Sequence, residues 1–350
     1  MRDPAFWWRD PGDVVTLATF LAPAAALYGA IAAWRMARGP RGWRAPVPVV
    51  CVGNFTLGGA GKTPTAMALA RLFLASGERP VFLSRGYGGR LAGPVRVGAH
   101  HCAEEVGDES LLLAGVAPTI VARDRRASAA AAVAAGASVL IMDDGLQNPS
   151  LAKDFGLALV DGRRGVGNGR VFPAGPLRAP LAAQLDCVSA VLVVGARGPS
   201  GAGATGAAAQ AVEAARQRGL PIFHGELRPD EAAAAALAGK PVLAFAGIAD
   251  PDKFFATLES CGIPAAVRAR YPDHHRYTVA EAGALLGRAK SERLILVTTE
   301  KDVARIRGDG LAAELAARVV ALPVTMEFDA GEEIGAAVLN AVGLRREGRA

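Results

Sequence analysis

The segment that most constrains this chain is a glycine-rich loop, which reads GNFTLGGAGKTPT from Gly53 to Thr65. It departs from the common phosphate-binding pattern G-x-x-x-x-G-K-[ST], because Thr56 occupies the place of the first glycine. A valine-rich run before the loop is typical of a buried parallel strand, and a segment with helical spacing follows it. Strand, glycine loop and helix are the context that nucleotide binding requires, so we interpret Thr56 as a variant of the motif.

The loop residues predict particular contacts with a nucleotide. Backbone amides around the glycines can surround the phosphates, and the dipole of the following helix favours negative charge there. Lys62 is expected to reach the β- and γ-phosphates, and the Thr63 hydroxyl is expected to ligate Mg²⁺. The residues assigned to nucleotide binding are Thr56, Gly58, Gly59, Ala60, Gly61, Lys62, Thr63 and Pro64.

Acidic residues elsewhere are candidates for a metal site and a base. Asp143 and Asp144 end an apolar run, and carboxylates at such a strand end beside a phosphate loop hold Mg²⁺. Asp108 begins a helical stretch, where it can either cap the helix or accept a proton from an attacking hydroxyl. The residues alone leave both roles of Asp108 open.

Two later segments also concentrate polar side chains. The turn YPDHHRY contains Asp273 and His274, which can orient a catalytic group or bind phosphate. The segment TTEKD, from Thr298 to Asp302, is either a loop that reads a nucleotide base or a helix cap with surface charges. Neither segment decides the chemistry by itself.

The charge balance limits the kinds of partner. A formal net charge of +6 favours an anionic substrate, an anionic membrane or nucleic acid, but sparse aromatic residues and the lack of a recognition motif argue against nucleic acid. Arginines recur in turn-like segments and include Arg85, Arg123 and Arg170. Around Arg85 and Arg170, glycine and proline fix the backbone, which suits bidentate recognition of phosphate. Four scattered cysteines suit a reducing compartment.

The N-terminal region predicts contact with a membrane. Residues 14–33 carry no charge, and a helix of that length measures about 30 Å, which is the thickness of a bilayer core. Arg35 and Arg38 follow it, so we expect the rest of the chain on the cytoplasmic side. Whether the segment spans the bilayer or lies on it stays open, and burial against the folded domain is the alternative.

Together these segments resemble the tetraacyldisaccharide 4′-kinase family, the lipid A 4′-kinases of Gram-negative bacteria. The segments that carry the resemblance are GNFTLGGAGKTPT, SRGYGG, VGDES, MDDGLQN, GNGRVFPAGPLR, FAGIADPDKFF, YPDHHRY and TTEKD. They spread over roughly residues 45–305. Members of this family also carry a hydroxyl residue in place of the first glycine of the loop, which accounts for Thr56.

The resemblance implies a fold and a reaction. The fold is α/β, with a P-loop-type parallel-sheet domain and a second, smaller α/β/α domain that contributes to an active-site cleft. The reaction is transfer of the γ-phosphate of ATP, with Mg²⁺, to the 4′-hydroxyl of an acylated glucosamine disaccharide 1-phosphate. We expect residues 1–44 to be the membrane-associated segment, residues 45–215 the kinase domain and residues 216–345 the second domain. We expect a monomer at the cytoplasmic face of the inner membrane.

The resemblance also implies roles for individual residues. Asp108 is expected to be the catalytic base, supported by His274 with Asp273 beside it, and Lys62 is expected to act on the transferred phosphate. The residues expected to contact the substrate are Arg85, Tyr87, Arg123, Gln147 and Arg170. One departure is Asn148, because family members usually have histidine there and asparagine cannot carry a proton. The alternative function is a membrane-associated P-loop ATPase or GTPase switch that phosphorylates no small molecule.

Overall fold

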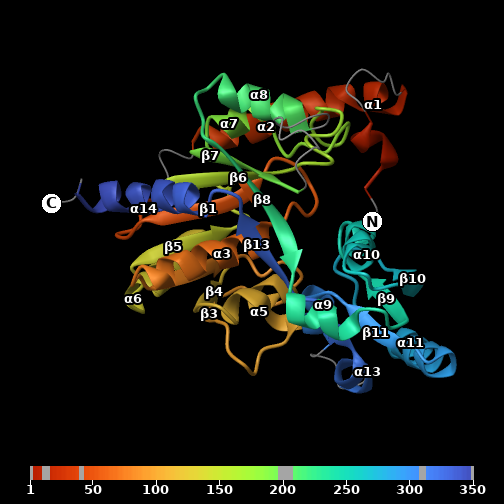
Figure 1. The fold of residues 1–350 in the computed structure, drawn as a ribbon. Coiled ribbons are helices and arrows are strands. Elements are labelled where there is room, and N and C mark those ends of the chain that lie inside the picture. The colour runs from red at the N-terminus through yellow and green to blue at the C-terminus, as the bar shows by residue number, and fades with distance from the viewer. Residues whose placement is uncertain (1–2, 10–15, 39–42, 196–207, 307–312, 348–350) are drawn as a thin grey trace.

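The computed structural model describes residues 3–9, 16–38, 43–195, 208–306 and 313–347, which form two sheets with helices around them (Figure 1). Within these residues the larger sheet has nine strands. In spatial order they are β13 (Val324–Phe328), β8 (Ile222–Pro229), β7 (Ala190–Val194), β6 (Phe155–Asp161), β1 (Val49–Asn54), β5 (Val139–Asp143), β2 (Pro80–Ser84), β4 (Thr119–Val121) and β3 (Val95–Arg96). The strands between β8 and β4 pair in parallel, and the pairs at the two edges are antiparallel.

The central strands are apolar because both faces of the sheet are covered. Every residue of β1 and β5 is buried. On one face Val50 and Val52 of β1 pack in a core with helices α3 (Lys62–Ala75), α5 (Asp108–Ala114) and α14 (Gly331–Glu347). On the other face the strands pack against α6 (Arg125–Ala134), α7 (Leu181–Leu185) and α8 (Ala209–Arg216). The C-terminal ends of parallel strands meet at one edge of the sheet, where ligands bind in such folds.

The smaller sheet has four parallel strands within the described residues, in the order β10 (Ala265–Arg270), β9 (Val242–Ala246), β11 (Ile295–Thr298) and β12 (Val320–Ala321). One of its faces packs against α9 (Glu231–Leu237) and α10 (Pro251–Ser260). The other packs against α11 (Val279–Glu292), α12 (Glu300–Ile306) and α13 (Ala313–Arg318). This is a second α/β/α unit with its own hydrophobic cores.

The chain enters and leaves the smaller unit through the antiparallel pair β8 and β13 (Figure 1). Both strands and most of α14 fall within residues 216–345, the range expected for the second domain, yet they extend the sheet and core of the first. The smaller sheet therefore takes up a narrower part of the chain, from Val242 to Ala321. The sequence did not reveal this because strand pairing joins segments that are distant along the chain.

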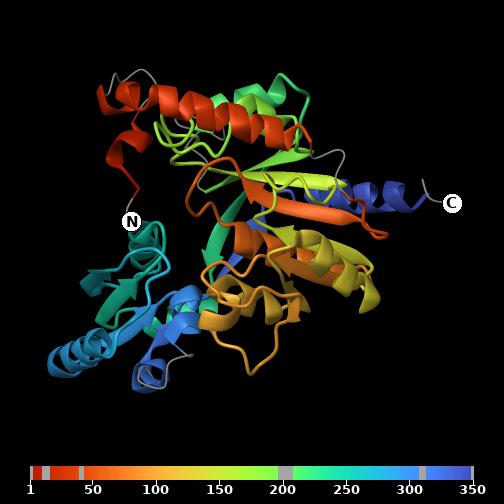
Figure 2. The ribbon, with the colours of Figure 1, turned by 180° about the vertical axis from the view of Figure 1, so that it is seen from behind.

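The expectation of a single helix over the N-terminal apolar run is wrong. It forms α1 (Thr16–Phe20) and α2 (Ala22–Met36), with Pro23 in the first turn of α2, and residues 14 and 15 of the run lie outside the described part. Among the residues that the structure describes, no helix is long and apolar enough to cross a membrane. Gly29 of α2 lies against Val171 and Pro180, and α2 runs beside α7 (Figure 2). One side of the segment is thus packed on the domain, as in the alternative interpretation.

The remaining helical segments are short. They are the 3₁₀ helix η1 (Ala5–Trp8) and the helix α4 (Ala103–Val106), and α4 directly precedes α5. The short β3 is followed by α4 along the chain. Gly107 separates α4 from α5 at a φ of 83°, a conformation that favours glycine, and an added Cβ would lie 2.5 Å from the Tyr87 carbonyl oxygen. This glycine therefore fixes how α5 begins.

Candidate active site

The glycine loop connects β1 to α3, as its sequence predicts. Gly58 and Gly61 both have positive φ, of 102° and 85°, which suits residues without a Cβ. Gly61 is the residue before α3, and Pro64 lies in the first turn of that helix, where a missing N–H costs no hydrogen bond. Thr56 is buried and forms a bridge with Leu177, so the variant position anchors the mouth of the loop.

The side chain of Lys62 folds back over the glycine loop that precedes it. Its Nζ donates to Asn54 Oδ1 at 3.1 Å and to the Gly58 carbonyl oxygen at 3.4 Å. Burial lowers the pKa of Lys62, and the nearby carboxylate of Asp144 opposes that effect. The Asp144 carboxylate is farther away, with its Oδ1 3.8 Å from Nζ. A cation that is partly stripped of water and donates to two neutral oxygens is ready to exchange those contacts for phosphate oxygens. Asn54, the last residue of β1, was not predicted as a site residue.

Thr63 and Asp143 form a second group of oxygens beside the lysine. Thr63 Oγ1 donates to Asp143 Oδ2 at 3.3 Å, and both residues are buried. Within the described part of the chain Asp143 Oδ1 has no hydrogen-bond partner, although it is buried too. Burial, followed by the charges of Glu109 and Asp144, raises the pKa of Asp143. A buried carboxylate with a free oxygen and a neighbouring hydroxyl fits the donor set that Mg²⁺ prefers.

Asp144 has a different environment from Asp143. Its backbone is left-handed, with a φ of 51°, and its carboxylate accepts two hydrogen bonds from Arg178 at 2.8 and 3.1 Å. Burial disfavours ionisation of this carboxyl, but Lys62 and Arg178 outweigh it and lower the pKa to about 2. Arg178 therefore neutralises one member of the acidic pair, a contact that the sequence did not predict.

Asp108 lies at the first position of α5, where its side chain is only 3% exposed and is in contact with the smaller unit. Its Oδ2 is 3.3 Å from Nδ1 of His274, and its Oδ1 accepts the backbone N–H of Glu109 at 2.9 Å. Burial opposes ionisation of Asp108, but His274 and Arg305 hold its pKa well below the ordinary value. Conversely, burial disfavours the charged imidazole of His274, and Asp108 raises its pKa overall. The two residues expected to form the base are thus in contact.

A small pocket opens beside this pair. Its wall combines residues of both units, namely Tyr87, Gly88, Ala103, Glu104, Asp108, His274, Arg276, Tyr277 and Arg305. The ring of Tyr87 lies against the His274 imidazole, with 4.9 Å between the ring centroids. Asp273 Oδ2 is 3.8 Å from His274 Nε2 on the other side of the ring. The position of the pocket next to Asp108 makes it a candidate site for the hydroxyl of an acceptor.

Glu109 connects the pocket to the phosphate loop. It accepts a hydrogen bond at 2.6 Å from Lys301 of α12, and its charge acts on the pKa values of both Lys62 and Asp143. Lys301 belongs to the segment TTEKD, which therefore meets α5 instead of lying on an open surface. The pairing of TTEKD with α5 was not predicted, since no local pattern links Glu109 to a residue 192 positions away.

The five residues expected to contact the substrate lie in different settings. Tyr87 lines the pocket, whereas Arg85 and Arg123 are exposed in the turns after β2 and β4. Gln147 donates to the Asn54 carbonyl oxygen and to Gln184, both at 2.8 Å, and Arg170 contacts the Ala18 carbonyl oxygen of α1 at 3.4 Å. The roles of these residues toward a substrate stay predictions.

Asn148, the departure from the family pattern, stabilises a turn. Its Oδ1 accepts hydrogen bonds from the backbone N–H and the hydroxyl of Ser150, at 2.9 and 2.6 Å. Lys153 donates to its carbonyl oxygen at 2.6 Å. These contacts need an acceptor oxygen and no proton carrier.

A parallel sheet, a glycine loop with lysine and threonine, and an acidic pair at the end of β5 define a P-loop nucleotide-binding protein of the phosphotransferase kind. The comparisons with known proteins are more specific. The family model for tetraacyldisaccharide-1-P 4′-kinase matches residues 17–343, and the chain belongs to this family.

Individual relatives agree with the family match. A tetraacyldisaccharide 4′-kinase of Methylobacterium sp. (strain 4-46) is 58% identical over 92% of this chain and 94% of its own length. A tetraacyldisaccharide 4′-kinase of Methylobacterium nodulans is 55% identical over 97% of this chain and 95% of its own length. A crystal structure of the "apo" form of LpxK from Aquifex aeolicus in complex with ATP has a TM-score of 0.71 and 25% identity, covering 93% of this chain and 99% of that one. These similarities do not favour the alternative of a nucleotide-dependent switch.

Proposed function

We propose that this chain is an ATP-dependent lipid kinase that phosphorylates the 4′-hydroxyl of a tetraacylated glucosamine disaccharide 1-phosphate. The observation that carries the proposal is the contact of Asp108 with His274 at a pocket, beside Glu109, whose charge acts on Lys62 of the phosphate loop. A switch protein needs a nucleotide site but no base for a second substrate. The family membership supports the same reaction and the use of ATP.

On the nucleotide side, Lys62 and the loop amides hold the phosphates of ATP. Lys62 exchanges its contact with Asn54 for the β- and γ-phosphates and balances their charge as the γ-phosphoryl group leaves ADP. Thr63 and Asp143, with Asp144 next to them, would hold Mg²⁺, which supplies further positive charge at the phosphates when bound. Arg178 keeps Asp144 ionised and in place.

On the acceptor side, Asp108 takes the proton of the 4′-hydroxyl. At the same time the hydroxyl oxygen forms a bond to the γ-phosphorus. Oδ1 is the available atom, because it accepts one hydrogen bond within the described residues whereas Oδ2 is approached by both His274 and Arg305. His274 orients the carboxylate and stabilises its negative charge. Tyr87 and Asp273 keep the imidazole in position.

The test of the proposal uses the full chain in detergent with Mg²⁺, γ-labelled ATP and the tetraacylated disaccharide 1-phosphate. We expect label in the lipid fraction, and we expect it to disappear in Lys62→Ala. Release of labelled phosphate that is independent of the lipid, with none in the lipid fraction, would contradict the proposal.

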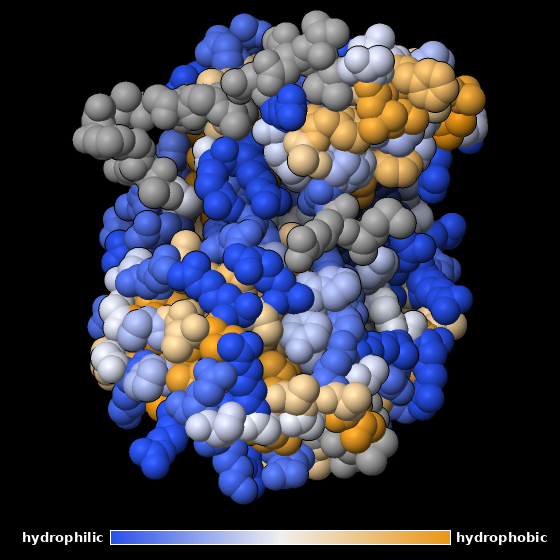
Figure 3. All heavy atoms as spheres, turned by 90° about the vertical axis from the view of Figure 1, so that its right-hand side faces the viewer, coloured by the Kyte–Doolittle hydropathy of each residue, from blue (hydrophilic) through white to orange (hydrophobic). Residues whose placement is uncertain are grey.

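We also propose that the chain works as a monomer on the cytoplasmic face of the inner membrane, through α1 and α2. The lining of the pocket by residues of this chain supports the monomer. An exposed apolar patch on the two helices supports the attachment, and it is visible at the upper right of Figure 3. Its residues are Leu17, Phe20, Leu27, Tyr28, Ile31 and Trp34. An apolar patch of this kind can bury in a lipid surface while the opposite side stays packed on the protein.

Vesicle flotation tests the attachment. The double variant Phe20→Ser with Trp34→Ser is expected to bind phosphatidylglycerol-containing vesicles about tenfold more weakly, because two large apolar side chains no longer leave water. The matched control is Leu74→Ser, since Leu74 is an exposed apolar residue of α3 away from the patch. Equal flotation of the double variant and the unchanged chain would exclude this mode of attachment.

A further inference from the structure

Arg305 of α12 is a buried guanidinium between the two units. Its side chain is 5% exposed, and its Nε and Nη2 each lie 2.6 Å from Oδ2 of Asp108. The two residues are 197 positions apart in the sequence. Two nitrogens on one carboxylate oxygen make a close, charge-assisted contact, and burial protects it from screening by water.

The smaller unit holds the guanidinium from behind. Nη1 of Arg305 donates to Asp302 Oδ1 at 2.8 Å and to the Gly247 carbonyl oxygen at 2.6 Å. Asp302 is fully buried and also accepts hydrogen bonds from the Tyr277 hydroxyl at 2.8 Å and the Thr299 hydroxyl at 2.6 Å. These partners come from the end of β9, the start of α12 and the turn before α11. The position of the Arg305 guanidinium is therefore set by contacts within the smaller unit, in addition to its contact with Asp108.

We infer that Arg305, oriented by Asp302, is a positioning residue that sets the direction of the Asp108 carboxylate for proton transfer. The inference rests on the proposed function, in which Asp108 is the base. Because Arg305 and His274 both approach Oδ2, the carboxylate cannot rotate without losing them, and Oδ1 stays directed to the acceptor. The smaller unit thus supplies two groups to the base, and the arginine lies deeper than the histidine.

The charges around Asp108 determine what the loss of Arg305 does. Burial raises the pKa of Asp108, and His274, Arg305 and Lys301 together lower it below the ordinary value. Further charged groups lie on the elements packed around Asp108, and they are Glu109, Glu104, Asp273, Arg276 and Lys62. Without Arg305 the effect of burial is opposed by fewer cations, so the carboxyl binds a proton at higher pH and stops acting as a base there.

A purely structural role gives different expectations. If Arg305 only joined the two units, its loss would lower the melting temperature and leave kcat of the folded enzyme unchanged. If it positions the base, its loss lowers kcat for phosphoryl transfer to the lipid, and a lysine at this position restores part of the rate. ATP binding stays unchanged in that case, since Lys62 and the loop lie outside the Arg305 contacts.

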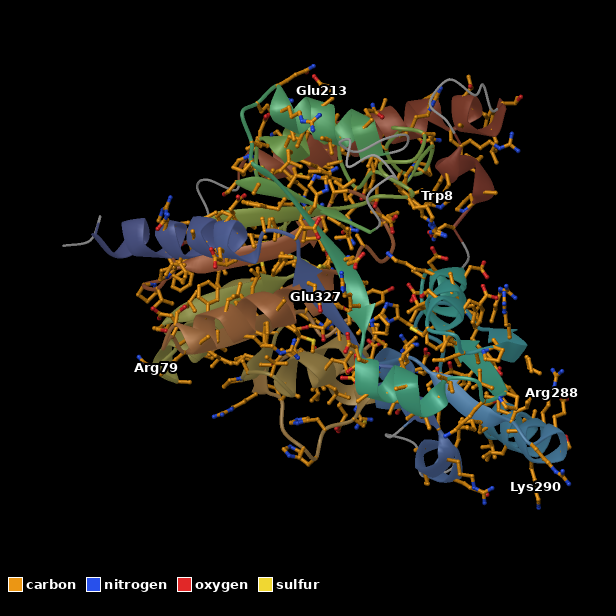
Figure 4. All side chains as sticks on the ribbon, viewed as in Figure 1. Trp8, Arg79, Glu213, Arg288, Lys290 and Glu327 are labelled. Carbon is orange, nitrogen blue, oxygen red and sulfur yellow. The ribbon has the colours of Figure 1, made fainter. Side chains whose placement is uncertain are left out.

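The experiment measures kcat and KM for lipid phosphorylation at neutral pH, together with ATP affinity and melting temperature, for the full chain in detergent. The variants are Arg305→Met, which removes the charge, Arg305→Lys, which keeps it, Asp302→Asn, which loosens the arginine, and Asp108→Asn. Arg288→Met is the matched control, because Arg288 lies on the outer side of α11 in Figure 4 and its side chain is 55% exposed.

We expect Arg305→Met to lower kcat about 100-fold, in the range of acid–base contributions, and to leave ATP affinity unchanged. Arg305→Lys should lower kcat only about tenfold, because it keeps a cation but cannot contact both Asp108 and Asp302 in the same way. Asp302→Asn should lower kcat less than Arg305→Met does. It tests the inference if Arg305→Met does not fold.

The outcomes separate the inference from the proposed function. Full activity of Asp108→Asn would show that Asp108 is not the base, and the proposed mechanism would be contradicted. Loss of activity in Asp108→Asn, together with a normal kcat in Arg305→Met or in Asp302→Asn, would overturn the inference alone.

Discussion

The two halves of the candidate active site are assembled in different ways. The nucleotide side consists of Lys62, Thr63, Asp143 and Asp144, and all four belong to the larger sheet unit. The acceptor side consists of Asp108 of that unit with His274 and Arg305 of the smaller one. One half is complete within a single fold unit, and the other exists only where two units meet.

This difference separates binding from chemistry. The nucleotide side consists of neighbouring strand ends and one loop, so we expect it to hold ATP when the proposed base is disturbed. Asp108, the proposed base, acquires its partners by contact between the units, so we expect proton transfer to depend on that contact. Each prediction below disturbs one side and measures whether the other responds.

The largest expected effect comes from the nucleotide side. Lys62→Ala should lower lipid phosphorylation by about 10³-fold and also weaken ATP binding, because a cation that offsets phosphate charge is lost in both states. The control is Lys290→Ala, since Lys290 is an exposed lysine on α11 (Figure 4). Initial rates and ATP titrations measure the two quantities. Unchanged ATP affinity in Lys62→Ala would contradict the assignment of the loop.

Asp108→Asn disturbs the acceptor side alone. The rate of lipid phosphorylation should fall about 10²- to 10³-fold, because an amide cannot take the proton of the hydroxyl, while ATP affinity stays the same. Asp186→Asn, at the exposed C-terminal end of α7, is the matched control. A fall in ATP affinity that equals the fall in rate would show that the two sides are not separate.

The smallest expected effect concerns pH and the contact between the units. Burial lowers and Asp108 raises the pKa of His274, and the net direction is upward from 6.5. The contact therefore adds stability that is fully present below pH 6.5 and is lost as the pH rises through the higher pKa of the folded state. The melting temperature of the unchanged chain should exceed that of His274→Gln by about 2 °C at pH 5.5, with a smaller difference at pH 9. A difference that grows with pH would contradict the pairing.

The same contrast explains what the sequence could predict. The nucleotide side follows from local patterns, since the loop, Lys62 and Thr63 are contiguous and Asp143 ends an apolar run. Arg305 and Lys301 carry no local sign of their partners, because only tertiary packing brings α12 to α5. The ion pair of Asp144 with Arg178 carries no local sign either, because the two residues are distant along the chain.

The fold shows the same limit. Two sheet units and a P-loop-type parallel sheet agree with the expectation, but pairing of β8 with β7 and β13 places late segments in the first unit. The apolar run from residue 14 was interpreted by length and charge alone. Its division into α1 and α2, with one side packed on α7, depends on tertiary contacts, which the hydropathy of the segment does not reveal.

A double-mutant cycle tests most directly whether the base is one unit shared by the two halves. It measures kcat/KM for lipid phosphorylation in Asp108→Asn, His274→Ala and the combined variant, with ATP affinity as a check on folding. The account predicts that the combined variant is within about threefold of the slower single variant. If the two residues act as one unit, the first substitution already removes their joint contribution to the rate, and the second removes little more. If the two losses multiply, Asp108 and His274 act independently, and a base built by contact between the units is contradicted.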